Sequence, residues 1–160
     1  AGCFERRFEK RGGCSMKDAD FKILNHRAKG FTKHSEGKTI EKNYSPDVSL
    51  KNKNNYILIE HETEPNRKTI VADVIKAAHF LQNDRTGILV IVMTPKGKSS
   101  LKSYPNHVKP YLIWIKDKTN LKEVYFLSEA DYFQNGNILE INSKQFNDLS
   151  IKIDNGILKS

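Results

Sequence analysis

The sequence predicts an α/β fold, in which a mixed β-sheet is flanked by helices. Two apolar runs of strand length, residues 56–62 (YILIEHE) and 88–94 (ILVIVMT), lie on either side of a segment whose apolar residues recur every three or four positions. A strand, a helix and a strand in this order form a crossover unit with two parallel strands. A polar turn directly before the first run predicts an antiparallel hairpin in front of that unit, so the sheet is expected to be mixed.

Length and composition indicate a single globular domain. The chain has 160 residues and a mass of 18.4 kDa, with 38% hydrophobic and 29% charged residues. We expect one domain over residues 1–160. It comprises an N-terminal helix and basic loop region (1–37), a central core (38–95), and C-terminal strands with a basic loop (96–160).

The N-terminal third carries the weakest patterns. Phe4 to Arg11 predict a short basic helix that ends at Gly12-Gly13. Residues 14–37 are polar without a strong period, so we expect loops with at most one short strand or helix. Two short strands, Lys38–Lys42 and Asp47–Leu50, are then expected around the break at residues 43–46.

The central segment carries the clearest patterns. Lys51–Asn55 predicts a turn, and Tyr56–Glu62 predicts a strand that is central in the sheet. A helix is expected over Arg67–Gln82, with Asn66 as its N-cap because an Asn side chain accepts from the free N–H groups of the first turn. Ile88–Thr94 predicts the second buried strand.

The C-terminal part is expected to add strands and one late helix. Lys96–Lys109 predicts a long basic loop, and Tyr111–Lys116 and Glu123–Leu127 predict strands. Trp114 and Phe126 fall in these apolar strand patterns, so we expect both in the core. Ser143–Leu149 predicts a helix.

The charge of the chain favours a polyanionic partner. The formal net charge is +8 and the pI is about 9.4. Lys and Arg side chains release condensed counterions when they meet phosphates, which favours nucleic acid binding. A solvated basic surface without a partner is the alternative. The candidate phosphate contacts are Lys68, Lys76, Lys96, Lys98 and Lys102, together with the N-terminal cluster Arg6, Arg7, Lys10 and Arg11.

Other classes of protein are disfavoured. Two cysteines do not make a disulfide framework, so a reduced, cytoplasmic setting is expected. No apolar run approaches the ~18 residues of a membrane span, and no membrane partner is expected. Gly97-Lys98-Ser99 resembles the end of a phosphate-binding loop, but Val92 stands where that motif needs its first Gly. We therefore expect no small-molecule cofactor.

Three acidic residues lie where two predicted strands meet. Asp47 begins one strand, and Glu60 and Glu62 end the next. An antiparallel hairpin returns to its starting edge, so the three carboxylates are expected at one place. Side chains alternate along a strand, so Glu60 and Glu62 share a face roughly 6.5–7 Å apart while His61 points to the other face.

A divalent cation would stabilise such a group of acids. Neighbouring carboxylates raise one another's pKa and oppose ionisation. Magnesium prefers oxygen ligands, with Mn²⁺ as a substitute, and a bound cation would activate water beside a phosphate. Acids that only solvate the edge of the strand are the alternative.

The motif resembles that of a known nuclease superfamily. Ser45-Pro46-Asp47, followed after a gap by Ile59-Glu60-His61-Glu62, a helix and an apolar strand, resembles the PD-(D/E)xK nuclease superfamily. Glu62 stands where that motif has Lys, as in the ExE variant of BamHI-type restriction endonucleases. The resemblance covers about residues 40–95.

The resemblance implies a fold, an activity and roles for residues. The fold would be restriction-endonuclease-like with an αβββαβ core, and the activity that of a Mg²⁺-dependent endonuclease on DNA, acting as a homodimer. Asp47, Glu60 and the backbone carbonyl of His61 would bind the metal. Glu62 would orient or deprotonate the attacking water, or bind a second metal. The missing positive charge would come from Lys68 or Lys76, and a further carboxylate from Glu5 or Glu9.

Three functions follow from the sequence. The first is a type II restriction-type, site-specific endonuclease that hydrolyses DNA phosphodiester bonds. The second is a DNA repair, junction-resolving or phage nuclease of the same superfamily. The third is a nucleic-acid-binding module without catalysis. A glycosidase that uses Glu60 and Glu62 is a distant fourth, because the basic charge favours anions.

Overall fold

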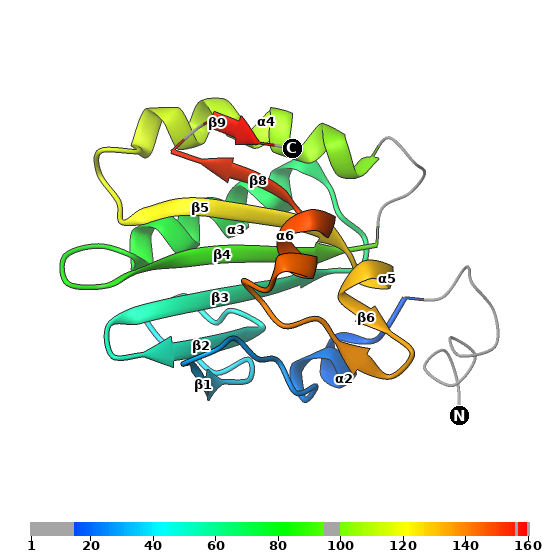
Figure 1. The fold of residues 1–160 in the computed structure, drawn as a ribbon. Coiled ribbons are helices and arrows are strands. Elements are labelled where there is room, and N and C mark those ends of the chain that lie inside the picture. Colours follow the sequence, from blue (N-terminus) through cyan, green and yellow to red (C-terminus); the bar gives the residue numbers. More distant parts are fainter. Residues whose placement is uncertain (1–14, 95–99, 156, 160) are drawn as a thin grey trace.

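The protein is built around one mixed β-sheet with helices on both faces, as the sequence predicts (Figure 1). The structure is a computed structural model that describes residues 15–94, 100–155 and 157–159. Helices α3 (Arg67–Phe80) and α4 (Ser100–Ile115) cover one face, and three short helices lie on the other. These are α2 (Asp18–Lys22), α5 (Glu129–Tyr132) and α6 (Lys144–Leu149).

Seven strands form the main sheet, in the order β1-β2-β3-β4-β5-β8-β9. Strands β3, β4 and β5 run parallel to one another, and every other pair in this sheet is antiparallel. A separate two-stranded ribbon is made of β6 and β7. The bounds are β1 Thr32–Ser35, β2 Val48–Asn52, β3 Asn55–Glu62, β4 Thr86–Met93, β5 Leu121–Ser128, β6 Phe133–Gln134, β7 Asn137–Ile138, β8 Ile151–Asp154 and β9 Ile157–Lys159.

The expected hairpin is confirmed. Strands β2 and β3 pair antiparallel from Val48↔Ile59 to Asn52↔Asn55, across a tight turn in which Lys53 has a positive φ of 54°. The expected strand at Lys38–Lys42 is wrong, because only an isolated bridge joins Glu41 to Tyr44 there. Strand β1 pairs with β2 instead. The 38–42 segment has one apolar residue, Ile40, which packs against the core and gives the segment no strand face of its own.

The expected parallel crossover is also confirmed. Helix α3 begins where the Asn66 side chain accepts from the backbone N–H of Thr69 at 3.0 Å. Strand β4 then pairs parallel with β3, with Glu60 opposite Ile91. Gly87 permits this close pairing, since a Cβ there would lie 2.2 Å from the carbonyl oxygen of Tyr56.

The predicted basic loop Lys96–Lys109 and the predicted strand Tyr111–Lys116 are wrong, because most of this segment is helix α4. Pro105 and Pro110 lie inside the helix, and each removes a backbone donor at a cost of about 3 kcal/mol. Apolar side chains at helical spacing offset this cost by packing on the sheet: Leu101, Tyr104, Val108 and Leu112.

Core placement was predicted correctly for one aromatic residue and wrongly for the other. Phe126 is fully buried in β5, as expected. Trp114 is 70% exposed, because the helix turns it away from the sheet, and Lys118 lies 5.3 Å from its ring centroid. The expected strand Glu123–Leu127 lies within β5, and the expected helix Ser143–Leu149 is α6 with Ser143 as its cap.

The N-terminal region is more regular than expected, since both α2 and β1 lie within residues 15–37. The predicted helix Phe4–Arg11 lies outside the described residues. Nowhere in residues 15–94, 100–155 and 157–159 is a helix both long and apolar enough to cross a membrane. The carboxyl ends of β3, β4 and β5 meet at one edge of the sheet, and the acidic residues lie at this edge.

Candidate metal centre

The hairpin brings Asp47 to the end of β3, as the sequence predicts. Asp47 directly precedes β2, and its Oδ2 accepts a hydrogen bond from the backbone N–H of His61 at 2.7 Å. The N–H and C=O groups of one strand residue point to the same side, so the His61 carbonyl also points to the Asp47 side. Asp47 and the backbone of His61 are therefore neighbours.

Glu60 and Glu62 face the helical layer formed by α3, and a third carboxylate from that helix joins them. Ligand atoms of Glu60, Glu62 and Asp73 all lie within 4.8 Å of one another. Glu60 is 8% exposed, whereas Glu62 and Asp73 are partly buried. A hydrogen-bonding contact links Glu60 to Asp47, and another links Glu62 to Asp73. We call these four residues (Asp47, Glu60, Glu62 and Asp73) the acidic cluster.

Three carboxyl groups of the acidic cluster have raised pKa values when no cation is bound. Burial, followed by the charges of Asp47 and Glu62, raises the pKa of Glu60 well above its ordinary value. Burial and the hydrogen bond that the protonated Asp73 donates to Glu62 raise the pKa of Asp73 to about 11. The pKa of Glu62 is also raised, chiefly by burial. Ionising the cluster therefore needs a compensating positive charge.

Two buried polar atoms at the acidic cluster lack a partner in the part of the chain that the structure describes. Among the described residues, Oδ2 of Asp73 and the hydroxyl of Tyr44 are buried without a hydrogen-bond partner. Tyr44 is 5% exposed, and burial together with the carboxylates of Glu60 and Asp73 raises its pKa. An unpaired buried polar atom costs about 1–3 kcal/mol. A Mg²⁺ ion, which takes only oxygen ligands and keeps several waters, suits this set of donors.

A lysine from α2 supplies positive charge at the edge of the acidic cluster. The Nζ of Lys22 lies 3.7 Å from Oδ1 of Asp47. Gly37 makes room for it, since a Cβ at Gly37 would lie 3.1 Å from that Nζ, and the φ of Gly37 is +77°. The pair is partly exposed, so the solvent weakens the attraction between these two side chains.

His61 faces the opposite side of the sheet, as expected from strand alternation. Its side chain is fully buried, with Nδ1 2.7 Å from Oδ1 of Asp18 and Nε2 3.6 Å from Oε1 of Glu129. The ring stacks on Phe21 with a centroid distance of 4.2 Å. Burial opposes the charged ring, but the carboxylates of Glu129 and Asp18 outweigh it and raise the pKa of His61.

The structure describes three of the five predicted phosphate-binding lysines. Lys68 and Lys102 are exposed near the first turns of α3 and α4, at the edge that carries the acidic cluster. Lys76 is exposed further along α3, roughly 13.5 Å from the start of the helix at 1.5 Å per residue. Lys96 and Lys98 lie outside the described residues, as do Glu5, Glu9 and the basic cluster at residues 6–11.

Sequence reasoning missed Asp73, Tyr44 and Lys22. Asp73 could have been found, because it lies three residues after Ile70 and four before Ala77 and so falls on the apolar face of the predicted helix. An acid on such a face needs a partner. Tyr44 and Lys22 lie in segments without a regular pattern, and only the tertiary structure brings them to the cluster.

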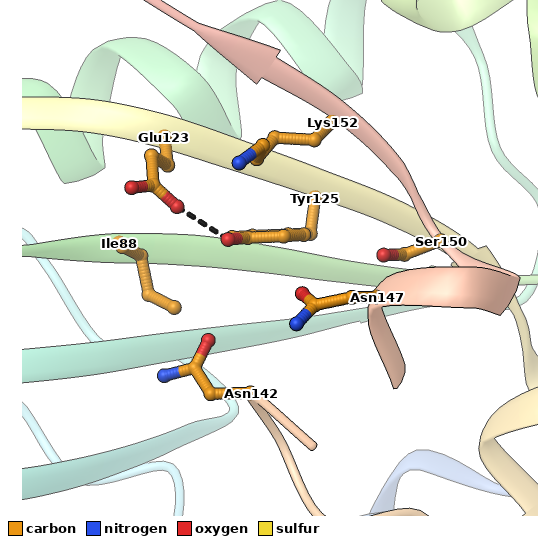
Figure 2. Close-up of a pocket in the computed structure, with 7 residues that line it drawn as sticks. All are labelled: Ile88, Glu123, Tyr125, Asn142, Asn147, Ser150 and Lys152. Carbon is orange, nitrogen blue, oxygen red and sulfur yellow. Dashed lines mark hydrogen bonds between the residues drawn. The ribbon is translucent and has the colours of Figure 1, made fainter. Parts of the chain in front are cut away.

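A separate cavity of about 590 Å³ lies on the opposite face of the sheet. As Figure 2 shows, it is bordered by Ile88 of β4, by Glu123 and Tyr125 of β5, by Lys152 of β8 and by α6, away from the carboxyl ends of the parallel strands. The Tyr125 hydroxyl donates to Glu123 there, and the amides of Asn142 and Asn147 line the opposite wall. With one carboxylate among neutral and basic groups, this cavity is unlike the acidic cluster.

Comparisons with known proteins give no relative. No protein-family model matches the chain, and no curated protein or solved structure matches it. The geometry of the acidic cluster and the sequence motif are therefore the features that indicate a function.

Proposed function

We propose that this protein is a Mg²⁺-dependent endonuclease that hydrolyses phosphodiester bonds in DNA, as a site-specific enzyme of the restriction type. The observation that carries the proposal is the convergence of Asp47, Glu60, Glu62 and Asp73 beside two unpaired polar atoms. The element order α2-β1-β2-β3-α3-β4 follows the αβββαβ order of the restriction-endonuclease-like core, which supports the same proposal.

The residues of the acidic cluster have separate tasks in this mechanism. Asp47, Glu60 and the carbonyl of His61 would hold the cation, and Asp73 would add a carboxylate from the helix side. A bound Mg²⁺ supplies a Lewis acid that stabilises charge on the phosphate and acidifies water. Glu62, less buried than Glu60, accepts a proton from the attacking water.

Positive side chains around the edge orient the phosphate backbone. Lys68 and Lys102 flank the acidic cluster from two helices that begin at this edge, and Lys22 lies beside Asp47. Helix N-termini also favour anions, which adds to the attraction. The net charge of +8 supports an approach by a polyanion.

The test is a plasmid digest with the whole chain in Mg²⁺ or Mn²⁺. Discrete bands, with ends read by run-off sequencing, are expected for a site-specific enzyme. Asp47→Ala should abolish cleavage, because it removes a proposed metal ligand. The variant should still shift DNA in a gel, because the Asp47 side chain is only 18% exposed and offers little surface to DNA. The control Glu64→Ala changes an exposed acid two residues after the motif and should cut like the wild type.

Other outcomes would point to the alternative functions. A smear, or cuts confined to branched DNA, would indicate another nuclease of the same superfamily instead of a restriction-type enzyme. DNA that shifts in a gel but stays intact in Mn²⁺ would indicate a binding module, and the catalytic proposal would fail.

A further inference from the structure

A buried carboxylate that the proposed chemistry does not use lies beneath the acidic cluster, on the other face of the sheet. Glu129 is the first residue of α5, directly after β5, and is 3% exposed. Its Oε1 accepts from the backbone N–H of Met16 at 2.9 Å, and its Oε2 accepts from the hydroxyl of Thr94 at 2.9 Å. A carboxylate is buried at such a place only with this kind of pairing.

Glu129 and Asp18 hold the His61 ring from two sides. The Glu129 Oε1 lies 3.6 Å from Nε2, and the Asp18 Oδ1 lies 2.7 Å from Nδ1. Phe21 stacks on the ring at an interplanar angle of 4°. Only Nδ1 makes a hydrogen bond, while Nε2 faces Glu129 at ion-pair distance and Phe21 covers one ring face, so three neighbours restrict the orientation of the His61 side chain.

The backbone of His61 transmits this orientation to the acidic cluster. The pairing of β2 with β3 stops at Val48↔Ile59, so the hairpin ladder does not extend to residues 60–62. On that side the His61 N–H donates to Asp47 instead. Glu60 and Glu62 are the two chain neighbours of His61, so a shift of this residue moves three carboxylates at once.

We propose that Glu129 is a positioning residue for the metal centre: with Asp18 it holds the His61 ring and thereby keeps Asp47 and the end of β3 in the arrangement that binds a divalent cation. This inference rests on the proposed function, because it assumes that the acidic cluster binds metal. Groups that orient the residues of a metal site typically change its affinity 10- to 100-fold when they are removed.

The experiment is a calorimetric titration of the whole chain with Mn²⁺, for the wild type, Glu129→Gln and Asp18→Asn. We expect Glu129→Gln to weaken Mn²⁺ binding about 10- to 100-fold, and Asp18→Asn, at a site that is 55% exposed, to weaken it less. Cleavage by Glu129→Gln should recover at high Mn²⁺, with an unchanged KM for DNA, because the ligands themselves remain.

Two controls separate positioning from a general loss of stability. Ile153→Val shortens a fully buried side chain in β8 and lowers the unfolding temperature without touching the acidic cluster. Asp148→Asn makes the same change as Asp18→Asn at an exposed site on α6. Both should bind Mn²⁺ like the wild type.

The outcomes for the two proposals differ. A wild type that binds Mn²⁺, with Glu129→Gln and Asp18→Asn equal to their controls, would overturn this inference and leave the proposed function standing. A wild type that binds no Mn²⁺ would overturn both. Should Glu129→Gln fail to fold, Asp18→Asn decides, since unchanged affinity in that variant contradicts the inference.

Discussion

The last three residues of β3 present two faces with opposite electrostatic arrangements. On one face Glu60 and Glu62 meet Asp73, and these acids compete for protons. On the other face His61 lies between Asp18 and Glu129, so its charges are paired within the protein. One strand thus carries a paired cluster and an unpaired one. This difference supports the proposal that the acidic face binds a cation.

The largest effect is expected from Glu60→Gln, which should act oppositely on activity and stability. Loss of a buried metal-binding carboxylate should reduce Mg²⁺-dependent cleavage about 100- to 1,000-fold, since such ligands contribute several kcal/mol. The metal-free protein should become more stable, because the buried carboxyl group that its neighbours keep protonated is replaced by a neutral amide. Cleavage assays and urea unfolding measure the two effects.

The contrast between the two faces of β3 would not hold if Glu60→Gln lost stability as well as activity. The control Glu64→Gln changes an exposed acid nearby and should alter neither property. A fall in the free energy of unfolding for Glu60→Gln alone would mean that the charges on this face are already compensated.

The next largest effect is expected from Asp73→Asn on metal affinity. The variant removes a carboxylate that only the helix supplies, and it should weaken Mn²⁺ binding about tenfold or more, because affinity follows the charge of the ligands. The rise in unfolding temperature on adding Mn²⁺ should shrink accordingly. The same rise in Asp73→Asn as in the exposed control Asp148→Asn would exclude Asp73 from the site.

Stability without metal should depend on pH through Asp73. Its pKa is raised to about 11 in the folded protein, whereas an unfolded Asp has a pKa near 3.9. The folded form therefore keeps a proton that the unfolded form loses, and the free energy of unfolding falls as pH rises above about 4, by up to about 1.4 kcal/mol per pH unit for one such proton.

Urea unfolding at pH 5 and pH 8 measures this dependence. Asp73→Asn should flatten it, and added Mg²⁺ should reduce it in the wild type by binding the ionised carboxylates. An equally steep loss of stability in Asp73→Asn would assign the dependence to another group.

The smallest effect is expected from the exposed lysines at the same edge. Lys68→Ala or Lys102→Ala should weaken DNA binding several-fold for all sequences and lower the salt slope by about one, as the loss of one phosphate contact does. Lys76→Ala, further along α3, is the matched control and should change DNA affinity less. Gel shifts at several salt concentrations measure these effects. Equal effects at all three positions would mean that DNA does not bind preferentially at this edge.

Much of the central fold could be predicted from the sequence. The apolar runs of β3 and β4, the cap at Asn66 and the helical period between them are local patterns, and the structure confirms the elements. Helix α4 could not be predicted in the same way. Its two prolines argue against a helix, and only packing on the sheet offsets their cost.

The sequence by itself determined that Asp47, Glu60 and Glu62 meet at one strand end, because hairpin geometry and strand alternation follow from local patterns. Only the tertiary structure decided which other groups join them. Asp73 arrives by the crossover helix, and Lys22 and Tyr44 arrive from segments without a period. The spacing of Asp73 places it on the apolar face of its helix, but which strand residues this face meets, and where Lys22 and Tyr44 lie, depends on how the layers pack against each other.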